Sequence, residues 1–288
     1  MKIILNIVTK SLTFLKLSGI LGLIIILLAP GGCKEQPVEI PDLKVGKRRV
    51  LIEELSGVNC NNCPDAAKEI EKIRGIVGAE NVVAVTIYPS LYGVLSRPLP
   101  ISKYDFRMPE SDAIVNLLGP ADAIPALSVN RTIVNTGDQT PFLVTKTQWS
   151  GLVRNALMKE PVVGVFLKTT FDAVSREVVI STDITPDQTL SGDYFLTALI
   201  TQDSIIDAQN DKNDILPAYA HRHVLRKVLS LPGGDRIAEP LTLRALITKS
   251  YTFRLPVDWD ATKCSAVAFV HKGVSSNFEV MQAAEKKF

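Results

Sequence analysis

The chain has 288 residues, 46% of them hydrophobic, with 32 lysines and arginines against 30 aspartates and glutamates. The formal charge of +2 includes several lysines near the N-terminus, so the rest of the chain is close to neutral. A near-neutral body without a basic stripe excludes the charge pattern typical of nucleic-acid-binding proteins, and we expect no nucleic-acid partner.

The N-terminus has the pattern of an export signal. Basic residues precede an apolar run over residues 17–29, which Pro-Gly-Gly-Cys ends. A membrane-spanning helix needs about 20 apolar residues, so this shorter run predicts a signal peptide over residues 1–32. Cys33 is similar to the cysteine of a bacterial lipobox, which carries acyl chains after cleavage. An ordinary secretory signal with an incidental cysteine and an uncleaved signal anchor are the alternatives.

Residues 33–48 are polar and contain two prolines, which indicates a tether between a membrane and a folded body. The residues after Cys33 lack the aspartate that retains some lipoproteins in the inner membrane, so we expect a lipid anchor in the outer membrane, with the leaflet undetermined. The following residues, about 240 in number, exceed the usual size of one domain. We place a boundary at Glu160–Pro161, where a predicted helix meets a proline.

Residues 49–160 alternate between strand and helix patterns. β-Branched and apolar runs predict strands at 50–56 and 81–88, and shorter ones at 124–129 and 132–135; helical spacing predicts helices from residue 64 to 77, over 109–118 and over 141–159. The proline-rich segment 89–108 between them is expected to be a loop that covers the cysteine pair or presents a groove to a partner.

Beyond residue 161 the helical period disappears. Strand-like runs separated by Gly, Pro, Asp and Asn clusters lie at 162–170, 177–184, 193–201, 220–229, 241–255, 265–271 and 278–284. Such spacing predicts an antiparallel sandwich over residues 161–288.

The stretch SGVNCNNCP contains the motif that carries chemistry. A strand that leads into Cys-x-x-Cys at a helix start is the context in which this motif performs thiol-disulfide exchange. Cys60, at the helix N-terminus, is the candidate nucleophile, because helix dipoles stabilise negative charge there; Cys63 is the resolving thiol. Glu54, six residues earlier, is placed to accept a proton, and Pro125 precedes a strand as a cis-proline loop would. Together with the element order, these features resemble the thioredoxin fold.

A disulfide that is only a structural brace is the main alternative for Cys60 and Cys63. Zinc is disfavoured, because a structural zinc site needs four ligands, usually from two such pairs, and we expect no metal or cofactor. His221 and His223 are interpreted as a polar strand face, and Cys264 as an inert core thiol. The acidic stretch TQDSIIDAQNDKND does not match a calcium-binding loop and is expected to be a solvated loop.

Four stretches, VLIEELSGVNCNNCP, AIPALSVNR, HRHVLRKVL and AVAFVHKGVSSNFEVMQAA, resemble the outer membrane protein 28-related lipoproteins of Bacteroidetes. The resemblance implies an exported, lipid-anchored envelope protein with a thioredoxin-like α/β domain followed by a β-rich domain, which we interpret as an all-β immunoglobulin-like sandwich. By position, Cys60 and Cys63 match the redox pair, Pro125 the cis-proline and Cys33 the lipidation site.

Two functions follow from this reading of the sequence. The first is thiol-disulfide exchange with the thiols or disulfides of exported proteins. The second is non-catalytic binding of a surface protein partner, as in adhesion, by a lipoprotein whose disulfide is structural.

Overall fold

The computed structural model describes residues 45–288, except 136, 213, 238–239 and 274–277. The expected signal peptide, Cys33 and most of the tether lie outside the described residues. These described residues form one compact unit. Within the described part of the chain, no helix has both the length and the apolar character needed to span a membrane.

The elements of the first half alternate between strands and helices. In chain order they are β1 (Val50–Leu55), α2 (Cys63–Val77), η1 (Ala79–Asn81), β2 (Val82–Ile87), η2 (Ser90–Ser96), α3 (Pro109–Leu118), β3 (Ala126–Val129) and α4 (Lys146–Leu157).

The second half consists mainly of strands. In chain order the elements are β4 (Val163–Phe171), β5 (Glu177–Pro186), β6 (Tyr194–Gln202), β7 (Ile205–Asp211), β8 (Asp214–His221), β9 (Val224–Val228), β10 (Asp235–Arg236), β11 (Ile247–Arg254), η3 (Ala261–Lys263), β12 (Cys264–Lys272) and β13 (Val280–Lys287).

One sheet joins the two halves of the chain. Its order is β13-β12-β6-β9-β2-β1-β3, with β10 paired to β6. β1 pairs with β2 in parallel and with β3 in antiparallel orientation, and β2 meets β9 through the pair Thr86–Val224. The sheet therefore continues across the boundary expected at Glu160–Pro161, and the α/β half and the β-rich half share one mixed α/β fold.

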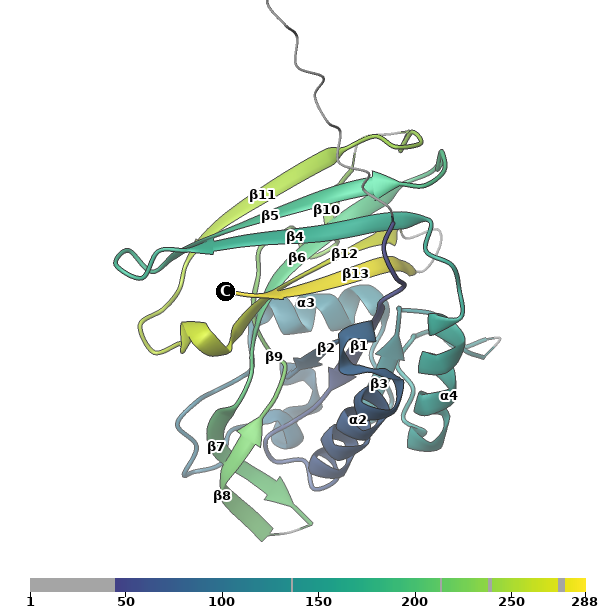
Figure 1. Cartoon of the computed structure of the whole chain (residues 1–288). Helices are drawn as coiled ribbons and strands as arrows, with labels where there is room; N and C mark the ends of the chain where they lie inside the picture. The colour runs from purple at the N-terminus through teal and green to yellow at the C-terminus, as the bar shows by residue number, and fades with distance from the viewer. Residues whose placement is uncertain (1–44, 136, 213, 238–239, 274–277) are drawn as a thin grey trace, which may run out of the picture. The chain divides into compact units, whose positions relative to one another are not determined.

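Helices and a second sheet cover the faces of this large sheet. α2 and α4 pack on one face of β1, β2 and β3, whereas α3 contributes to a core that also takes residues from β6, β9, β12 and β13. A separate sheet, β11-β5-β4, packs on β6, β12 and β13 (Figure 1). β12 is covered on both faces and buries all but its last residue, while β11 alternates between half-buried and exposed residues.

Two local expectations were wrong. Residues 132–135 form no strand, because Asn130 and Arg131 both have positive φ, 50° and 54°, and turn the chain away from the sheet. The last helix of the first half begins at Lys146 rather than at residue 141, because Leu143 is held in an extended bridge to Leu127.

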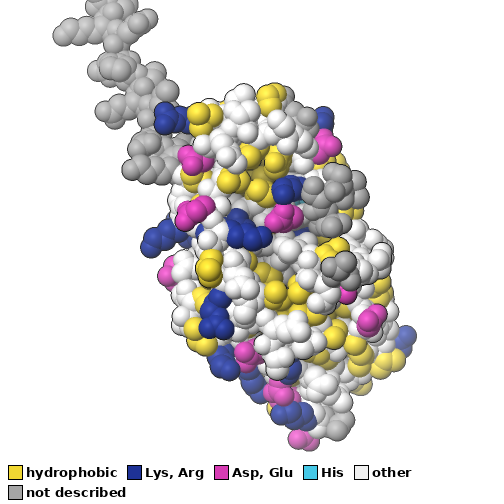
Figure 2. All heavy atoms as spheres, turned by 90° about the vertical axis from the view of Figure 1, so that its right-hand side faces the viewer, with side chains coloured by type: hydrophobic (Ala, Val, Ile, Leu, Met, Phe, Trp, Pro, Cys, Tyr) yellow, Lys and Arg dark blue, Asp and Glu magenta, His cyan; other side chains and the backbone are white. Residues whose placement is uncertain are grey.

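The surface carries charges of both signs. Figure 2 shows basic and acidic side chains interspersed over the face that it views, with apolar areas between them. Lys68, for example, lies 3.5 Å from Asp65 and 3.8 Å from Asp211. Exposed pairs of this kind contribute about 0–1 kcal/mol each, so the fold depends mainly on its interior.

A buried ion pair fixes the centre of that interior. Arg131 donates hydrogen bonds from Nε and Nη2 to the carboxylate of Glu53, at 2.9 and 2.7 Å, and both side chains are 1% exposed. The Arg131 guanidinium also lies 4.8 Å from the ring centroid of Phe269 on β12. The neighbouring Asn130 accepts hydrogen bonds from the amides of Leu51 and Val280, which ties β1 to β13.

Arg131→Met is expected to destabilise the protein by about 3–5 kcal/mol, because it leaves the Glu53 carboxylate buried without its partner. The measurement is urea-induced unfolding followed by circular dichroism. The double variant Glu53→Leu/Arg131→Met is the control, and it should recover most of the loss because no isolated charge remains. A cost below about 1 kcal/mol for Arg131→Met alone would contradict the central role of this pair.

Candidate functional site

Two cysteines form a disulfide at the N-terminal end of α2. The sulfur atoms of Cys60 and Cys63 lie 2.13 Å apart. Cys63 is the first residue of α2, and Cys60 lies in the turn that precedes the helix. The first amide groups of a helix lack intrahelical acceptors and favour nearby negative charge. The pair is therefore placed where a thiolate is stabilised once the disulfide is reduced.

Glu54 lies on β1 beneath this turn. Its side chain is 3% exposed, Oε2 accepts a hydrogen bond from Thr86 Oγ1 at 3.3 Å, and the buried Oε1 has no hydrogen-bond partner. Burial raises the pKa of Glu54 to about 8. Glu54 and Cys63 line the same cavity. A carboxyl group with a pKa in this range is present as both acid and carboxylate near neutral pH, and its carboxylate form can accept a proton from a neighbouring thiol.

The loop before β3 carries the expected cis-proline. The Ile124–Pro125 peptide bond is cis. Cys60 Sγ lies 3.9 Å from the Ile124 carbonyl oxygen, so this loop lies beside the first cysteine. The structure thus brings together the four residues that the sequence singled out: Cys60 and Cys63, with Glu54 below and Pro125 beside them.

A lid formed by η2 connects the cysteine turn to the cis-proline loop. The amide of Asn59 donates to Leu95 O at 2.9 Å, and the hydroxyl of Tyr92 both donates to Ala121 O and accepts from Ala121 N, each at 3.0 Å. At Gly57 a Cβ atom would lie 2.3 Å from Leu95 O, so the close approach of the lid requires glycine. Both cysteines are 2% exposed under this cover.

The hairpin β7–β8 holds the cysteine turn from another side. Gln209 Nε2 donates to Gly57 O at 3.1 Å and to Cys60 O at 3.2 Å. The amide of Asn210 donates to Val58 O at 2.9 Å. In this way a segment far along the chain fixes the backbone of the residues that lead into the disulfide (Figure 1).

The expectation of a solvated loop over TQDSIIDAQNDKND was therefore wrong. β8 lacks the alternation that identifies a half-buried strand, because its first five residues are exposed. A usable signal was present in the two short apolar runs around the turn residues NDKN. The Asp207 carboxylate accepts hydrogen bonds from the amides of Lys103 and Tyr104, at 2.8–3.0 Å, and anchors the segment after the lid.

The two histidines of HRH do not share a strand face. His221 ends β8, with Nδ1 at 3.0 Å from the Tyr88 hydroxyl and Nε2 at 3.2 Å from Ala208 O, and burial lowers its pKa to about 4. His223 lies in the turn before β9 with φ 53° and contacts Glu71 and Asp203. Among the described residues, no group of three or more His, Cys, Asp or Glu is arranged to hold a metal ion.

Cys264 lies away from the disulfide, at the start of β12. It is fully buried, its Sγ donates to Asp260 O at 3.3 Å, and burial raises its thiol pKa to about 12. A thiol with this pKa stays protonated and unreactive at neutral pH.

Comparison with known proteins identifies related sequences and folds. The sequence profile of the family described as outer membrane protein Omp28 matches residues 120–287. HBP35 of Porphyromonas gingivalis is similar in structure, with a TM-score of 0.65 and 17% identity over 84% of this chain and 76% of that chain. A domain of the outer membrane lipoprotein Omp28 from Porphyromonas gingivalis gives a TM-score of 0.31 and 18% identity over 45% of this chain and 90% of that chain. No curated protein matches the sequence.

Glu54→Gln is expected to flatten the dependence of stability on pH. The folded protein keeps the Glu54 proton up to a pKa of about 8, whereas the ordinary value is 4.5. The stabilisation is therefore complete below pH 4.5 and is lost as the pH rises to about 8, at about 1.4 kcal/mol per pH unit. Urea unfolding at pH 5 and pH 8.5 measures this slope. Glu177→Gln, on the exposed start of β5, should leave the slope unchanged, and an unchanged slope in Glu54→Gln would refute the assignment.

Tyr92→Phe is expected to loosen the lid. Loss of the hydrogen bonds to Ala121 removes about 1 kcal/mol, which makes the open form about five times more populated. Reduction of the disulfide by excess dithiothreitol should accelerate by the same factor. Tyr104→Phe is the matched control, because Tyr104 contacts Phe106 and Arg226 through its ring. Equal rates for Tyr92→Phe and the wild type would show that the lid does not limit access.

Proposed function

This chain belongs to the outer membrane protein Omp28 family, and from that membership we propose that it acts in the cell envelope as a thiol-disulfide exchange protein. The observation that carries the proposal is the Cys60–Cys63 disulfide at the start of α2, between the cis-proline loop and a buried carboxyl group. Each part has a role in one reaction, and together they form a complete site for disulfide exchange.

The α/β half supports a thioredoxin-like arrangement. β1 enters the cysteine turn, pairs in parallel with β2, and pairs in antiparallel orientation with β3, which follows the cis-proline. α2 begins at the second cysteine. In the β-rich half, the packing of β4, β5 and β11 on β6, β12 and β13 supports a sandwich of the immunoglobulin type, whose larger sheet continues into the α/β half.

The proposed reaction starts from the reduced pair. The Cys60 thiolate attacks a disulfide of an exported protein, forms a mixed disulfide and releases one thiolate of that protein. Cys63 then loses its proton to Glu54 and attacks Cys60 Sγ, which closes the Cys60–Cys63 bond and releases the second client thiolate. Pro125 shapes the groove in which the client chain lies. The reverse sequence oxidises a client dithiol.

The proposed location in the cell envelope depends on the N-terminal residues of this chain. We propose that residues 1–32 are removed on export, that Cys33 carries the acyl chains and that residues 33–48 tether the body to the outer membrane. The partners are then exported proteins with thiols or disulfides. The unusual proline at position 30 makes acyl mass on Cys33, measured on the membrane fraction, the direct test of the anchor.

A surface-binding lipoprotein with a structural disulfide is the second candidate. The observation that favours it is the burial of both cysteines, each 2% exposed beneath a hydrogen-bonded lid. A disulfide in this environment reacts slowly with a large client unless the lid opens. For a structural disulfide the same burial is favourable, because it protects the bond from reduction.

Titration of the mature chain against a glutathione redox buffer separates the two candidates. For an exchange protein, the pair should titrate between roughly −120 and −270 mV, whereas structural disulfides lie below about −300 mV. Reduction of a protein disulfide should be lost in Cys60→Ser. Cys264→Ser is the matched control and should keep activity, because that thiol is buried away from the disulfide. A potential below −300 mV without turnover would establish the brace.

A further inference from the structure

We propose that His223, held between Glu71 and Asp203, is the exit for the proton that Glu54 takes from Cys63, and that one water molecule in the cavity beside Glu54 connects them. This inference rests on the proposed exchange reaction. The acceptor Glu54 is buried, so a turnover that deprotonates Cys63 requires a route by which its proton reaches solvent.

The cavity provides the first part of the route. Its volume of about 20 Å³ is sufficient for one water molecule. Glu54, Cys63, Glu71 and His223 all contribute to its lining, and the unpartnered Oε1 belongs to the Glu54 carboxyl group within it. A water at this position has polar partners on both sides.

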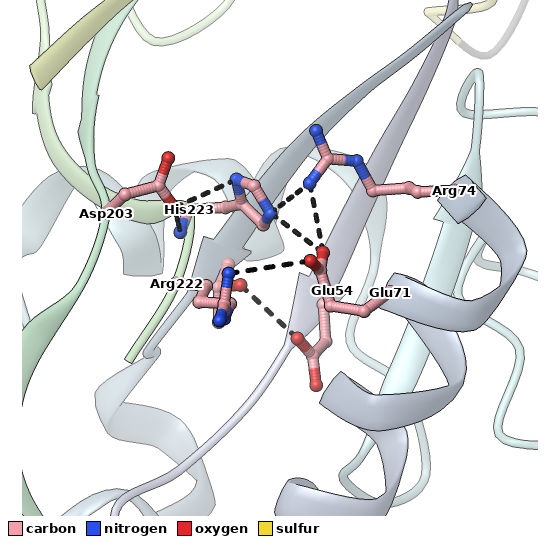
Figure 3. Close-up of polar contacts among 7 residues, drawn as sticks. Glu54, Glu71, Arg74, Asp203, Arg222 and His223 are labelled. Atoms are coloured by element: carbon pink, nitrogen blue, oxygen red, sulfur yellow. Dashed lines mark hydrogen bonds and ion pairs between the residues drawn. The ribbon is translucent and has the colours of Figure 1, made fainter. Parts of the chain in front are cut away.

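His223 provides the second part, because it lies where the cavity meets a surface pocket. It lines the cavity and also a surface pocket of about 340 Å³. The link to Glu54 is short: Thr86 donates its hydroxyl to Glu54 Oε2 at 3.3 Å and its backbone amide to His223 O at 2.8 Å. Figure 3 shows Glu54 on the strand below the cluster, with Glu71 and Arg74 on the helix and Asp203, Arg222 and His223 opposite.

The imidazole has a partner in either protonation state. When His223 is charged, Nε2–H donates to Glu71 Oε1 at 3.1 Å; when it is neutral, the Nε2 lone pair accepts from Arg74 Nη1. Nδ1 lies 3.2 Å from Asp203 Oδ1 without a hydrogen bond between them, and Oδ1 instead accepts from the backbone amide of His223 at 2.8 Å. The side chains of Glu71 and Asp203 are 36% and 25% exposed, so the cluster reaches solvent. A group that is partnered with and without its proton can pass that proton on without rearrangement.

The electrostatic surroundings of His223 contain both signs. α2 contributes Glu71 and Arg74, and the chain before β7 contributes Asp203; hydrogen bonding to His223 lowers the pKa of Glu71 to about 2. The other charged groups that face the histidine from the pocket rim are Arg49, Glu80, Arg222, Glu285 and Lys287.

In the resolving step, the Cys63 thiol gives its proton to the Glu54 carboxylate as its sulfur bonds to Cys60 Sγ. The bond between Cys60 and the client breaks, and the client thiolate takes a proton from solvent. The proton on Glu54 then passes through the cavity water to His223 and leaves at the surface. One proton enters and one leaves the protein–client complex, and the electron pair of the broken bond remains on the client sulfur.

The test measures single-turnover closure of the Cys60–Cys63 bond from pH 5.5 to 8.5. His223→Asn removes the imidazole ring, and asparagine tolerates the positive φ of this position. We expect closure to slow at least tenfold at pH 7, to lose the pH dependence of the wild type and to recover in proportion to added imidazole. Glu71→Gln keeps the shape of the cluster and should slow closure in the same direction if His223→Asn does not fold.

Glu279→Gln is the matched control, because it removes an ion-paired carboxylate, 2.7 Å from Lys272, outside the cavity lining. Its rate should equal that of the wild type. The exit route is overturned if the wild type turns over and a folded His223→Asn protein closes the disulfide at the same rate, with the same pH profile and no response to imidazole. In that case the proposed exchange function is unaffected. Absence of turnover in the wild type overturns both proposals.

Discussion

The buried pair of Glu53 and Arg131 is the constraint on which the arrangement depends. An isolated charge in the interior costs several kcal/mol, so the pair forms only where both groups meet with good geometry. Glu53 lies on β1, Arg131 follows β3, and the guanidinium stacks on Phe269 of β12. The ion pair joins β1 to the residue after β3, and the guanidinium contact with Phe269 connects it to the β-rich half. Asn130 repeats the connection through hydrogen bonds to both β1 and β13.

Joining the halves in this way lets the second half complete a site that begins in the first. β2 meets β9 through a single residue pair, and the chain between β6 and β9 leaves the sheet as the hairpin β7–β8. Its Gln209 amide holds the carbonyl groups around Cys60. His223, in the turn that follows, lines the cavity beside Glu54. A free-standing α/β domain ending at residue 160 would lack both.

The sequence was sufficient for the parts governed by local rules. Strand runs of β-branched residues, the helix after Cys-x-x-Cys and the proline before β3 predicted the four residues that the structure brings together. The sequence was insufficient where contacts between distant residues determine the structure. The hairpin β7–β8 is stabilised by hydrogen bonds to residues about 150 positions earlier, such as Gln209 to Gly57, and its only local signal is two short apolar runs without the alternation of a half-buried strand. The join between the halves was missed for the same reason, because β2 meets β9 through Thr86 and Val224, which lie far apart in the sequence.

The lid and the chemistry beneath it make opposing demands. A thiolate must be reachable to attack, yet the carboxyl group that takes the proton from Cys63 must stay out of bulk solvent, since burial is what raises its pKa. The lid η2 and the hairpin β7–β8 meet these two demands separately, because they contact the cysteine turn from different sides. The lid η2 is bound to the turn and the cis-proline loop by a few hydrogen bonds near Cys60, so it can open on the client side. The hairpin contributes Gln209, Tyr219 and His221 to the lining of the Glu54 cavity, and no residue of η2 belongs to that lining, so movement of the lid leaves these cavity walls in place.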